Sequence, residues 1–383
     1  MSNDASSSLG QLDFSKGRLR CARRSRGETL KGLATAIGVN EATVARYESG
    51  QKRPTYEHQE AIARHLGYPL AYFYSSPLEE VSERAISFRS RRDTSATIKG
   101  KVIARSMHAS GLISKLFRSR FRLPDACVPD YQGHDPEFAA GALREEWGLG
   151  RAPLGNLTHL IEAKGIEIFW LYEPSLCLDG LSYHQDSRFF IFLNMFKESG
   201  ERTRFDIAHE LAHLVLHRNR EKLDDLKAEE EAHQFASAFL MPAEAFKIDC
   251  PTQPILAKFM PLKSKWGVSI AAMVRRAYSL GVLSKDKYYR AFKDISGRGW
   301  RSNGEPNKIP IERSALHSMI YQRLQQRGIS PVDIANEIHL SLKDLLELTP
   351  VAQDFLGKLE AQYAHLSLVN YSSEEFEKLY RHS

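Results

Sequence analysis

One short segment constrains this 383-residue chain more than any other, the run from His209 to His213, which is His-Glu-Leu-Ala-His. In a helix, residues four positions apart lie one turn apart on the same face. Both imidazoles can therefore bind one metal ion, with Glu210 held beside them. Apolar residues between Ile207 and Val215 supply a side for packing, and Asp206 is placed to cap the helix. The segment predicts a helix with a metal site on one face.

A second, acidic helix follows and can complete this site. A catalytic zinc ion needs a third protein ligand and an open position for water. Residues 229–242 begin with Glu229, Glu230 and Glu231, continue with an apolar face and end at Pro242. A glutamate near the start of this helix can reach the metal, and spacing alone does not choose among the three.

The charge of the chain is unevenly distributed. Residues 1–124 hold 22 Lys and Arg against 11 Asp and Glu, a balance of +11, whereas the rest holds 31 against 36, a balance of −5. A basic segment is typical of a surface that meets a polyanion such as nucleic acid. Uneven surface charge without any partner is the alternative explanation.

Short helical segments separated by turns fill the basic part. An arginine-rich helix is expected over residues 16–26, and its charge suits contact with phosphate. Thr29 is expected to cap a short helix, Gly38 to form a turn at positive φ, and Asn40 to cap the next helix, Glu41–Tyr47. Two short helices joined by a glycine turn are typical of a helix-turn-helix. A helical protein-interaction module without DNA is the alternative.

This part of the chain resembles the Xre (Cro/434 repressor-like) family. The motifs that carry the resemblance are Gly27, Thr29, Leu33-Ala34, Gly38-Val39, Thr43-Val44, Arg46-Tyr47-Glu48, Gly50 and Arg53-Pro54. The resemblance implies a five-helix domain over residues 1–78 that binds double-stranded operator DNA, with a homodimer on two half-sites as the expected form. The family usually has Gln where Leu30 stands.

The same resemblance implies which residues meet DNA. The Glu41–Tyr47 helix would lie in the major groove. The candidate base or phosphate contacts are Asn40, Glu41, Ala42, Thr43 and Arg46.

Residues 79–124 are interpreted as a connection between two parts. Residues 82–92 form a charged connector, and residues 97–122 predict a long basic helix with one apolar face. This helix can add phosphate contacts, or it can pack its apolar stripe on the following domain and leave its arginines in water. We prefer the second interpretation.

The metal-site segment and the acidic helix resemble the ImmA/IrrE family of gluzincin-type zinc metallo-endopeptidases. The patterns RxRFxxAHELAHLxLH and ExxAxxFAxxFLMP carry the resemblance, and residues 179–182 and 266–281 also fit it. We assign residues 125–300 to this domain. The resemblance implies that Zn²⁺ is bound by His209, His213 and Glu229.

Further roles follow from the resemblance and from zinc chemistry. The zinc would lower the pKa of its bound water to about 7, and Glu210 would take the proton as the water attacks a peptide carbonyl. Tyr183 and His184 are candidate donors to the oxyanion. The family usually has Asn where His233 stands, so His233 can orient a ligand, compete as a ligand or simply be tolerated. His217 is expected to support the ligands or the helix.

The strand expected over Arg188–Asn194 has two possible roles. It can hold an extended peptide substrate by strand addition. Its apolar residues run without alternation, which is also typical of a strand buried on both faces.

The last region, residues 301–383, contains an echo of the first. A polar segment interpreted as a linker or lid precedes helices expected over residues 311–327 and 332–347. Residues 328–341 align with residues 27–40 at an offset of 301, but His339 replaces the turn glycine, and Asp344 and Glu347 make the second helix acidic. We expect an interaction surface or a brace for the peptidase rather than a second DNA reader.

Composition limits the remaining possibilities. Hydrophobic residues make up 42% of the chain and charged residues 26%, which excludes a disordered or low-complexity protein. The four cysteines lie far apart without a CxxC pair, which argues against a disulfide framework or a thiolate zinc site. The polar N-terminus and short apolar runs predict no signal peptide, no membrane partner and a cytoplasmic location.

These features predict a mainly α protein with a small β-sheet, an α+β fold. The leading hypothesis is a DNA-binding regulator with zinc-dependent endopeptidase activity. Its substrate would be a regulatory protein, repressor or antitoxin-like, in a stress or mobile-element response. The alternative is a non-enzymatic regulator whose peptidase-like domain senses a ligand or partner. In a third hypothesis, the N-terminal domain of a peptidase only docks a protein.

Overall fold

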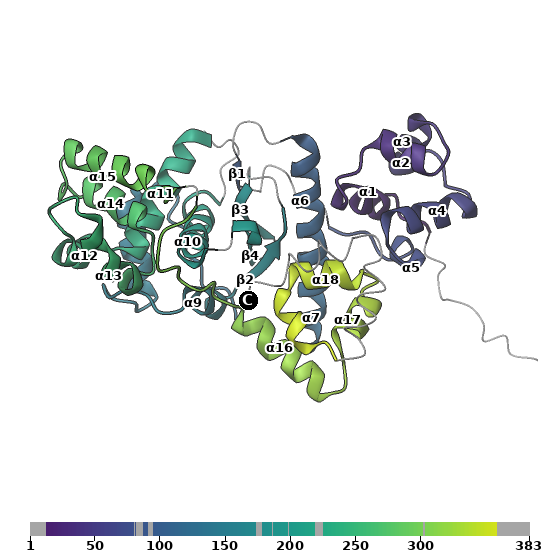
Figure 1. Ribbon diagram of the computed structural model, residues 1–383. Coiled ribbons are helices and arrows are strands. Elements are labelled where there is room, and N and C mark those ends of the chain that lie inside the picture. Colours follow the sequence, from purple (N-terminus) through teal and green to yellow (C-terminus); the bar gives the residue numbers. More distant parts are fainter. Residues whose placement is uncertain are drawn as a thin grey trace, which may run out of the picture. The chain divides into compact units, whose positions relative to one another are not determined.

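The computed structural model describes residues 13–79, 81, 87–90, 95–173, 178–185, 187–197, 199–218, 225–301 and 303–357. Two compact units make up the chain (Figure 1). The first comprises Met1–Glu80, Ser95–Arg120 and Tyr321–Ser383, and the second comprises Val81–Thr94 and Phe121–Ile320. Helices dominate and one small β-sheet is present, which confirms the predicted α+β class. The predicted connector at 82–92 lies largely outside the described residues.

Five helices open the first unit, as the sequence predicts. They are α1 (Lys16–Ser25), α2 (Leu30–Ala36), α3 (Glu41–Ser49), α4 (Tyr56–Leu66) and α5 (Leu70–Phe73). The predicted caps are present, because Thr29 accepts a hydrogen bond from the Gly32 N–H and Asn40 accepts one from the Thr43 N–H. Gly38 has a φ of 70°, which is the left-handed turn that joins α2 to α3.

The predicted basic helix is present as three consecutive segments. They are α6 (Ala96–His108), the π-helical η2 (Ala109–Ser114) and α7 (Lys115–Arg120). Within the first unit α6 packs on α1, and the buried His108 ring lies 2.8 Å from the Tyr72 hydroxyl and 3.5 Å from Cys21 Sγ. This segment therefore groups with the N-terminal helices, which differs from our preference for packing on the following domain.

The chain ends, within the described residues, in α16 (Ala315–Gln326), α17 (Pro331–Glu337), α18 (Leu342–Leu348) and the 3₁₀ segment η4 (Pro350–Phe355). The division between the two units falls inside α16. The single helix predicted over residues 332–347 is wrong, because the chain turns at His339 with a φ of 55°.

The second unit is built on a four-stranded sheet. Its strands are β1 (Ser87–Ser90), β2 (Ile166–Leu171), β3 (Leu178–Gln185) and β4 (Arg188–Asn194), in the order β1-β3-β4-β2. Only the β2–β4 pair is parallel among these three pairings. The strand predicted at 188–194 is confirmed, and it is buried on both faces. Its predicted alternative role in strand addition is wrong, because β3 and β2 occupy both of its edges.

The two faces of this sheet have different coverings. Alternate residues such as Ile168 and Ile191 join the main core with the helices α10 (Gly200–Leu216) and α11 (Asp225–Leu240). The opposite face is aromatic, with Phe169 stacked on Phe192 at 5.7 Å between ring centroids. The α10 helix therefore lies against one face of the sheet, beside β3 (Figure 1).

The start of α10 differs from the prediction. Asp206 is not a cap, because the helix begins six residues earlier at Gly200. The Gly200 N–H donates to the Ile309 carbonyl at 3.1 Å, and a Cβ at Gly200 would lie 2.3 Å from the Pro310 carbonyl oxygen. The close approach of residues 309–310 thus requires glycine here and defines where the helix starts.

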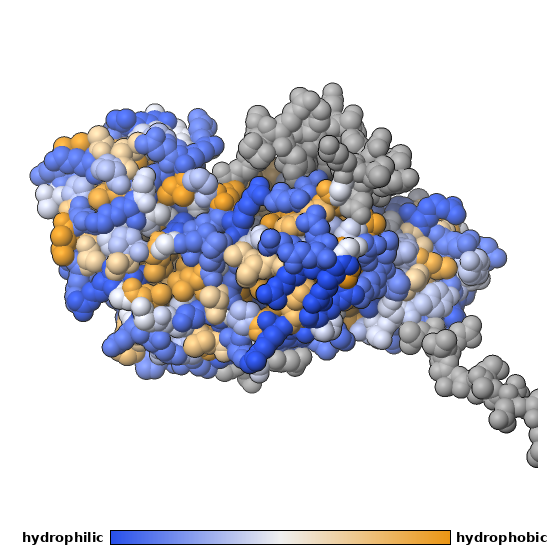
Figure 2. All heavy atoms as spheres, turned by 90° about the horizontal axis from the view of Figure 1, so that it is seen from below, coloured by the Kyte–Doolittle hydropathy of each residue, from blue (hydrophilic) through white to orange (hydrophobic). Residues whose placement is uncertain are grey.

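Further helices surround α10 and α11. They are α8 (Pro136–Glu146), α9 (Leu157–Ala163), α12 (Ala243–Asp249), α13 (Leu256–Trp266), α14 (Ile270–Ser279) and α15 (Lys285–Gly297). Arg144 of α8 links this helix to α11 and to the loop after α8, because it donates to the carbonyls of Gly150, Ala152 and Phe239. In the view of Figure 2, apolar side chains lie between hydrophilic ones in small patches.

The polar segment after α15, around Glu305, is attached to the second unit by buried contacts and is not the linker or lid that its composition suggests. Glu305 accepts hydrogen bonds from the first N–H groups of α14, Ile270 and Ala271. The fully buried Lys263 ammonium lies between Glu201 and Glu305, at 2.8 and 3.5 Å. Buried charges that are paired in this way hold a segment firmly, because releasing either partner would leave an uncompensated charge.

None of the helices in the described parts of the chain combines the length and the apolar character needed to cross a membrane.

Candidate metal centre and DNA-binding helix

Three side chains from α10 and α11 converge on one point. His209 and His213 lie on the same face of α10, with their Nε2 atoms 3.2 Å apart. The Glu229 carboxylate on α11 lies 3.4 Å from His209 Nε2 and 3.5 Å from His213 Nε2. All three donor atoms lie within 4.8 Å of one another, so the group could hold a metal ion.

The spacing of these atoms fits zinc. Zinc–nitrogen and zinc–oxygen bonds are about 2.0–2.2 Å long, so neighbouring ligand atoms of a tetrahedral site lie about 3.3–3.5 Å apart. The three separations of 3.2, 3.4 and 3.5 Å are close to that edge length. Two imidazoles and one carboxylate are also the donor set of catalytic zinc sites that leave a fourth position open.

Position within α11 distinguishes the three candidate glutamates. Glu230 is exposed and accepts a hydrogen bond from Gln234 at 3.1 Å. Glu231 lies 2.9 Å from His217 Nε2. Glu229 alone of the three faces the two histidines of the metal-binding motif, in agreement with the ligand set that the family resemblance implies.

The electrostatics of the cluster keep this carboxylate ionised. Burial by itself raises the pKa of Glu229, but hydrogen bonds from His209 and His213, together with their charge, outweigh that effect and lower the pKa well below its usual range. An ionised carboxylate is the form that binds a metal.

Glu210 lies beside the ligands in a closely fitted position. Its side chain is fully buried, and the Ser182 hydroxyl donates to Oε2 at 2.8 Å. A Cβ added to Gly180 would lie 3.1 Å from Glu210 Oε1 and 3.1 Å from the Phe192 carbonyl oxygen. The Ser182 hydroxyl of β3 therefore binds the Glu210 carboxylate, and the missing side chain of Gly180 leaves space for it. The family resemblance included the segment 179–182, but it did not assign a role to Ser182.

The two candidate oxyanion donors lie on opposite faces of β3. Tyr183 is buried on the aromatic face, where its ring stacks on Phe192 at 5.7 Å, and so it points away from the face that carries Ser182 and contacts Glu210. His184 shares the face of Ser182, and its ring stacks on Phe189 at 5.9 Å. Burial lowers the pKa of His184, and the charge of Arg218 lowers it further.

His233 and His217 both lie next to ligands. The His233 ring packs on the His209 ring at 4.9 Å between centroids. His217 Nδ1 lies 2.9 Å from His213 Nδ1, and its Nε2 lies 2.9 Å from Glu231 Oε2. Partners of this kind orient a metal-binding imidazole and fix which nitrogen carries the proton. The link to Glu231 was not predicted, because Glu231 is distant in sequence from His217.

Helix α3 presents the predicted DNA-contacting residues outward. Glu41, Ala42 and Arg46 are exposed and Thr43 is half-buried, whereas Val44 is buried against the unit. The Asn40 side chain is engaged as the cap, since its Oδ1 accepts from both the N–H and the hydroxyl of Thr43 at 2.8 Å.

Three of the arginines of α1 make contacts within the domain, and the contact of this helix with phosphate stays a prediction. Arg23 binds both carboxylate oxygens of the buried Glu48, at 2.6 and 2.9 Å. Arg20 donates to the Glu48 carbonyl at 3.0 Å, and the buried Arg18 donates to the Ser76 carbonyl at 2.8 Å. These bonds attach α1 to the end of α3 and to the chain after α5.

Two family models match the chain. Residues 19–73 match the family described as "Helix-turn-helix", and residues 162–278 match the family described as "IrrE N-terminal-like domain". The chain joins an Xre-type helix-turn-helix domain to an ImmA/IrrE-like peptidase domain. The first match spans α1 to α5, and the second spans the sheet strands β2 to β4, the metal-site helices and α14. A helix-turn-helix DNA-binding domain is thus combined with a peptidase-like domain.

More distant comparisons add little to these matches. No curated protein matches the chain. A crystal structure of Bacillus thuringiensis PlcR in complex with the peptide PapR7 and DNA matches at 15% identity, over 94% of this chain and 100% of that chain, with a TM-score of 0.15. A TM-score this low does not establish a common fold.

Proposed function

We propose that the protein is a DNA-binding regulator whose ImmA/IrrE-like domain is a zinc-dependent endopeptidase acting on a regulatory protein. The observation that carries the proposal is the convergence of His209, His213 and Glu229 at zinc-like spacing, with the buried Glu210 beside them. A repressor or antitoxin-like protein is the proposed class of substrate, because the ImmA/IrrE resemblance implies it.

The proposed chemistry assigns a separate task to each side chain. A zinc ion held by His209, His213 and Glu229 supplies Lewis acidity, which lowers the pKa of a bound water and polarises the scissile carbonyl. Glu210 accepts the proton of that water as it attacks and passes it to the departing amine. Ser182 keeps the Glu210 carboxylate in one orientation through its 2.8 Å hydrogen bond.

The arrangement of Glu210 favours an enzyme over a ligand sensor. A sensor that only binds a metal has no use for a second carboxylate that is fully buried beside the ligands without being one of them. Burying a carboxylate costs free energy unless it is well paired, so its presence indicates a role in proton transfer.

The decisive experiment compares wild-type protein with Glu210→Gln in cells, by identifying newly formed protein N-termini. Zinc content measured on both purified proteins should be equal, because Glu210 is not a ligand. Cleavage products should disappear in the variant. Glu230→Gln is the matched control, since Glu230 is an exposed glutamate of the neighbouring helix, and it should leave cleavage unchanged. Undiminished cleavage in Glu210→Gln would refute the mechanism.

The DNA-binding half of the proposal depends on α3. Arg46 is the exposed cation of that helix and is expected to meet a phosphate or a base edge. Binding to promoter DNA by the full-length protein should weaken in Arg46→Ala and fall steeply with salt. Binding that depends on neither would favour a domain that docks a protein instead.

A further inference from the structure

The C-terminal helices repeat the backbone of the DNA-binding helices. At the offset of 301, α17 (Pro331–Glu337) coincides residue for residue with α2 (Leu30–Ala36), and α18 starts where α3 starts. The residues before and between the helices also correspond. Gly27 and Gly328 have φ values of 67° and 72°, and Gly38 and His339 have values of 70° and 55°.

The hydrogen bonds of the turn are repeated as well. The Val39 N–H donates to the Ala34 carbonyl at 2.9 Å, and at the corresponding positions the Leu340 N–H donates to the Ala335 carbonyl at 2.9 Å. Thr29 and Ser330 both act as caps by accepting an N–H three residues on. Buried apolar residues correspond in four pairs, which are Leu33 with Ile334, Ala34 with Ala335, Val44 with Leu345, and Tyr47 with Leu348.

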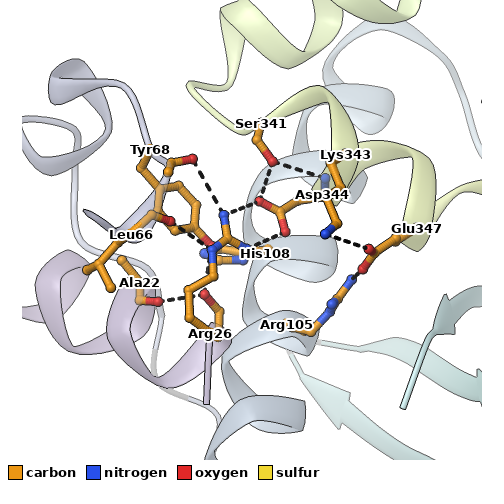
Figure 3. Close-up of polar contacts among 12 residues, drawn as sticks. Ala22, Arg26, Leu66, Tyr68, Arg105, His108, Ser341, Lys343, Asp344 and Glu347 are labelled. Atoms are coloured by element: carbon orange, nitrogen blue, oxygen red, sulfur yellow. Dashed lines mark hydrogen bonds and ion pairs between the residues drawn. The ribbon is translucent and has the colours of Figure 1, made fainter. Parts of the chain in front are cut away.

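The outer faces of the two final helices differ. In α3, several residues including Arg46 are exposed, whereas no residue of α18 is exposed. The positions that correspond to Thr43 and Arg46 are Asp344 and Glu347. Both of these acids bind arginines of the first unit (Figure 3). The exposed helix that carries Thr43 and Arg46 thus has as its counterpart a covered helix that carries two acids at these positions.

The Asp344 contact has the geometry of a specific ion pair. Arg26 Nη1 and Nη2 lie 2.6 and 2.8 Å from the two carboxylate oxygens, and Asp344 is 2% exposed. The same guanidinium donates through Nε to the Leu66 carbonyl at 2.8 Å and lies 4.3 Å from the centroid of the Tyr68 ring. The acid therefore meets an arginine that the helix-turn-helix domain has already oriented.

The second acid binds the basic helix α6. Glu347 accepts a hydrogen bond from Arg105, whose side chain is 8% exposed. Lys343 lies 3.9 Å from the same carboxylate, one turn away on α18 (Figure 3). Because Arg26 ends α1 and Arg105 lies on α6, the two acids hold the two helices that pack against each other in the first unit.

We propose that residues 321–357 form a second helix-turn-helix unit that has exchanged DNA for protein as its ligand, and that the outer face of α18 binds Arg26 and Arg105 of the same chain. Carboxylates and phosphates both accept two parallel bonds from a guanidinium, so acids on this helix bind arginine as a phosphate would. The same acids repel DNA. By this proposal α3 reads DNA and α18 does not, and the docked unit links α6 to α1.

Hydrogen–deuterium exchange of the full-length protein tests the docking. Glu347→Arg places two cations together, and breaking a buried pair should raise the exchange rate of the α18 amides about a hundredfold. Exchanging the charges, in Glu347→Arg with Arg105→Glu, should recover much of the lost protection. Glu337→Gln is the control, because its pair with Arg120 is more exposed and should matter little. Unchanged α18 exchange in Glu347→Arg, or a double variant no better protected than the single one, would overturn the proposal.

DNA binding tests the other half of the inference. Lys343 is the basic residue on α18 near the acids, and it corresponds to Ala42 of α3. Lys343→Ala should leave the affinity for duplex DNA unchanged, whereas Arg46→Ala should lower it about tenfold or more. Loss of binding in Lys343→Ala, with Arg46→Ala unaffected, would show that α18 reads DNA and would overturn the assignment. Cleavage in the same preparations is independent of this result, so failure here is distinguishable from failure of the proposed peptidase.

Discussion

Removal of the Ser182 hydroxyl is expected to separate the structural and the chemical roles of Glu210. In wild type this hydroxyl lies 2.8 Å from Glu210 Oε2 and 3.1 Å from the Glu210 carbonyl oxygen, and both residues are buried. Ser182→Ala keeps the Cβ as a methyl group and removes only the oxygen. The substitution therefore removes one donor to a buried carboxylate and creates almost no cavity.

The expected magnitude follows from the type of bond. A hydrogen bond to a charged group contributes about 1.5–3 kcal/mol, roughly twice the value for a neutral pair. We expect the unfolding free energy of the second unit to fall by this amount. Because about 1.4 kcal/mol corresponds to a factor of ten, cleavage should fall about tenfold to a hundredfold if the bond is needed to orient Glu210 in the transition state.

Tryptophan fluorescence during urea unfolding measures the stability term on the second unit alone. All four tryptophans (Trp147, Trp170, Trp266 and Trp300) lie in that unit. A double-mutant cycle with Glu210→Gln isolates the coupling between the two side chains. Thr203→Ala is the control, since Thr203 lies on the same helix and its hydroxyl donates to the Ser199 carbonyl at the start of that helix. A coupling energy below about 0.5 kcal/mol would refute the argument that Ser182 positions Glu210.

Three further predictions concern metal, DNA and pH. Zinc at about a hundred times its dissociation constant should stabilise the second unit by about 2.7 kcal/mol, measured by tryptophan fluorescence, and His209→Ala should abolish the effect. Arg46→Ala should reduce the slope of log affinity against log salt by about 1 in a DNA titration, if Arg46 contacts a phosphate. Burial raises the pKa of Asp344, but Arg26 and Arg105 outweigh it and hold the pKa well below its usual range. The ion pair thus stabilises the fold above the unfolded pKa of about 3.9 and loses its effect as the pH falls below that value. The stability lost in Asp344→Asn, followed by circular dichroism, should shrink as the pH falls from about 5 towards 2.

Local signals predicted the helix-turn-helix helices well. The caps Thr29 and Asn40 and the turn at Gly38 act within a few residues of their own position, so their effect on the backbone can be inferred without tertiary contacts. The start of α10 could not be predicted in this way. Asp206 is a good cap by local criteria, but the helix starts six residues before it, at Gly200, where residues 309–310 approach closely.

The partners of charged side chains were harder to predict from the sequence than the backbone geometry. The sequence of an arginine-rich helix does not show whether its arginines bind phosphate or a buried carboxylate. For Arg23, the position of Glu48 on α3 shows that it binds a carboxylate. The acids of the C-terminal repeat presented the same difficulty. Asp344 predicts a helix unsuited to DNA, but not that Arg26, distant in sequence, is its partner.

The sequence by itself determined the two histidines, the neighbouring glutamate and the helix that carries them, because a four-residue spacing on a helix is a local geometric fact. Tertiary structure decided which of three adjacent glutamates faces those histidines, and that Ser182 and Gly180 of β3 accommodate Glu210. The reason is that the rotation of α11 about its axis, and the packing of β3 on α10, depend on how complete helices and strands bury their apolar faces against each other. Neighbouring residues in the sequence do not encode that packing.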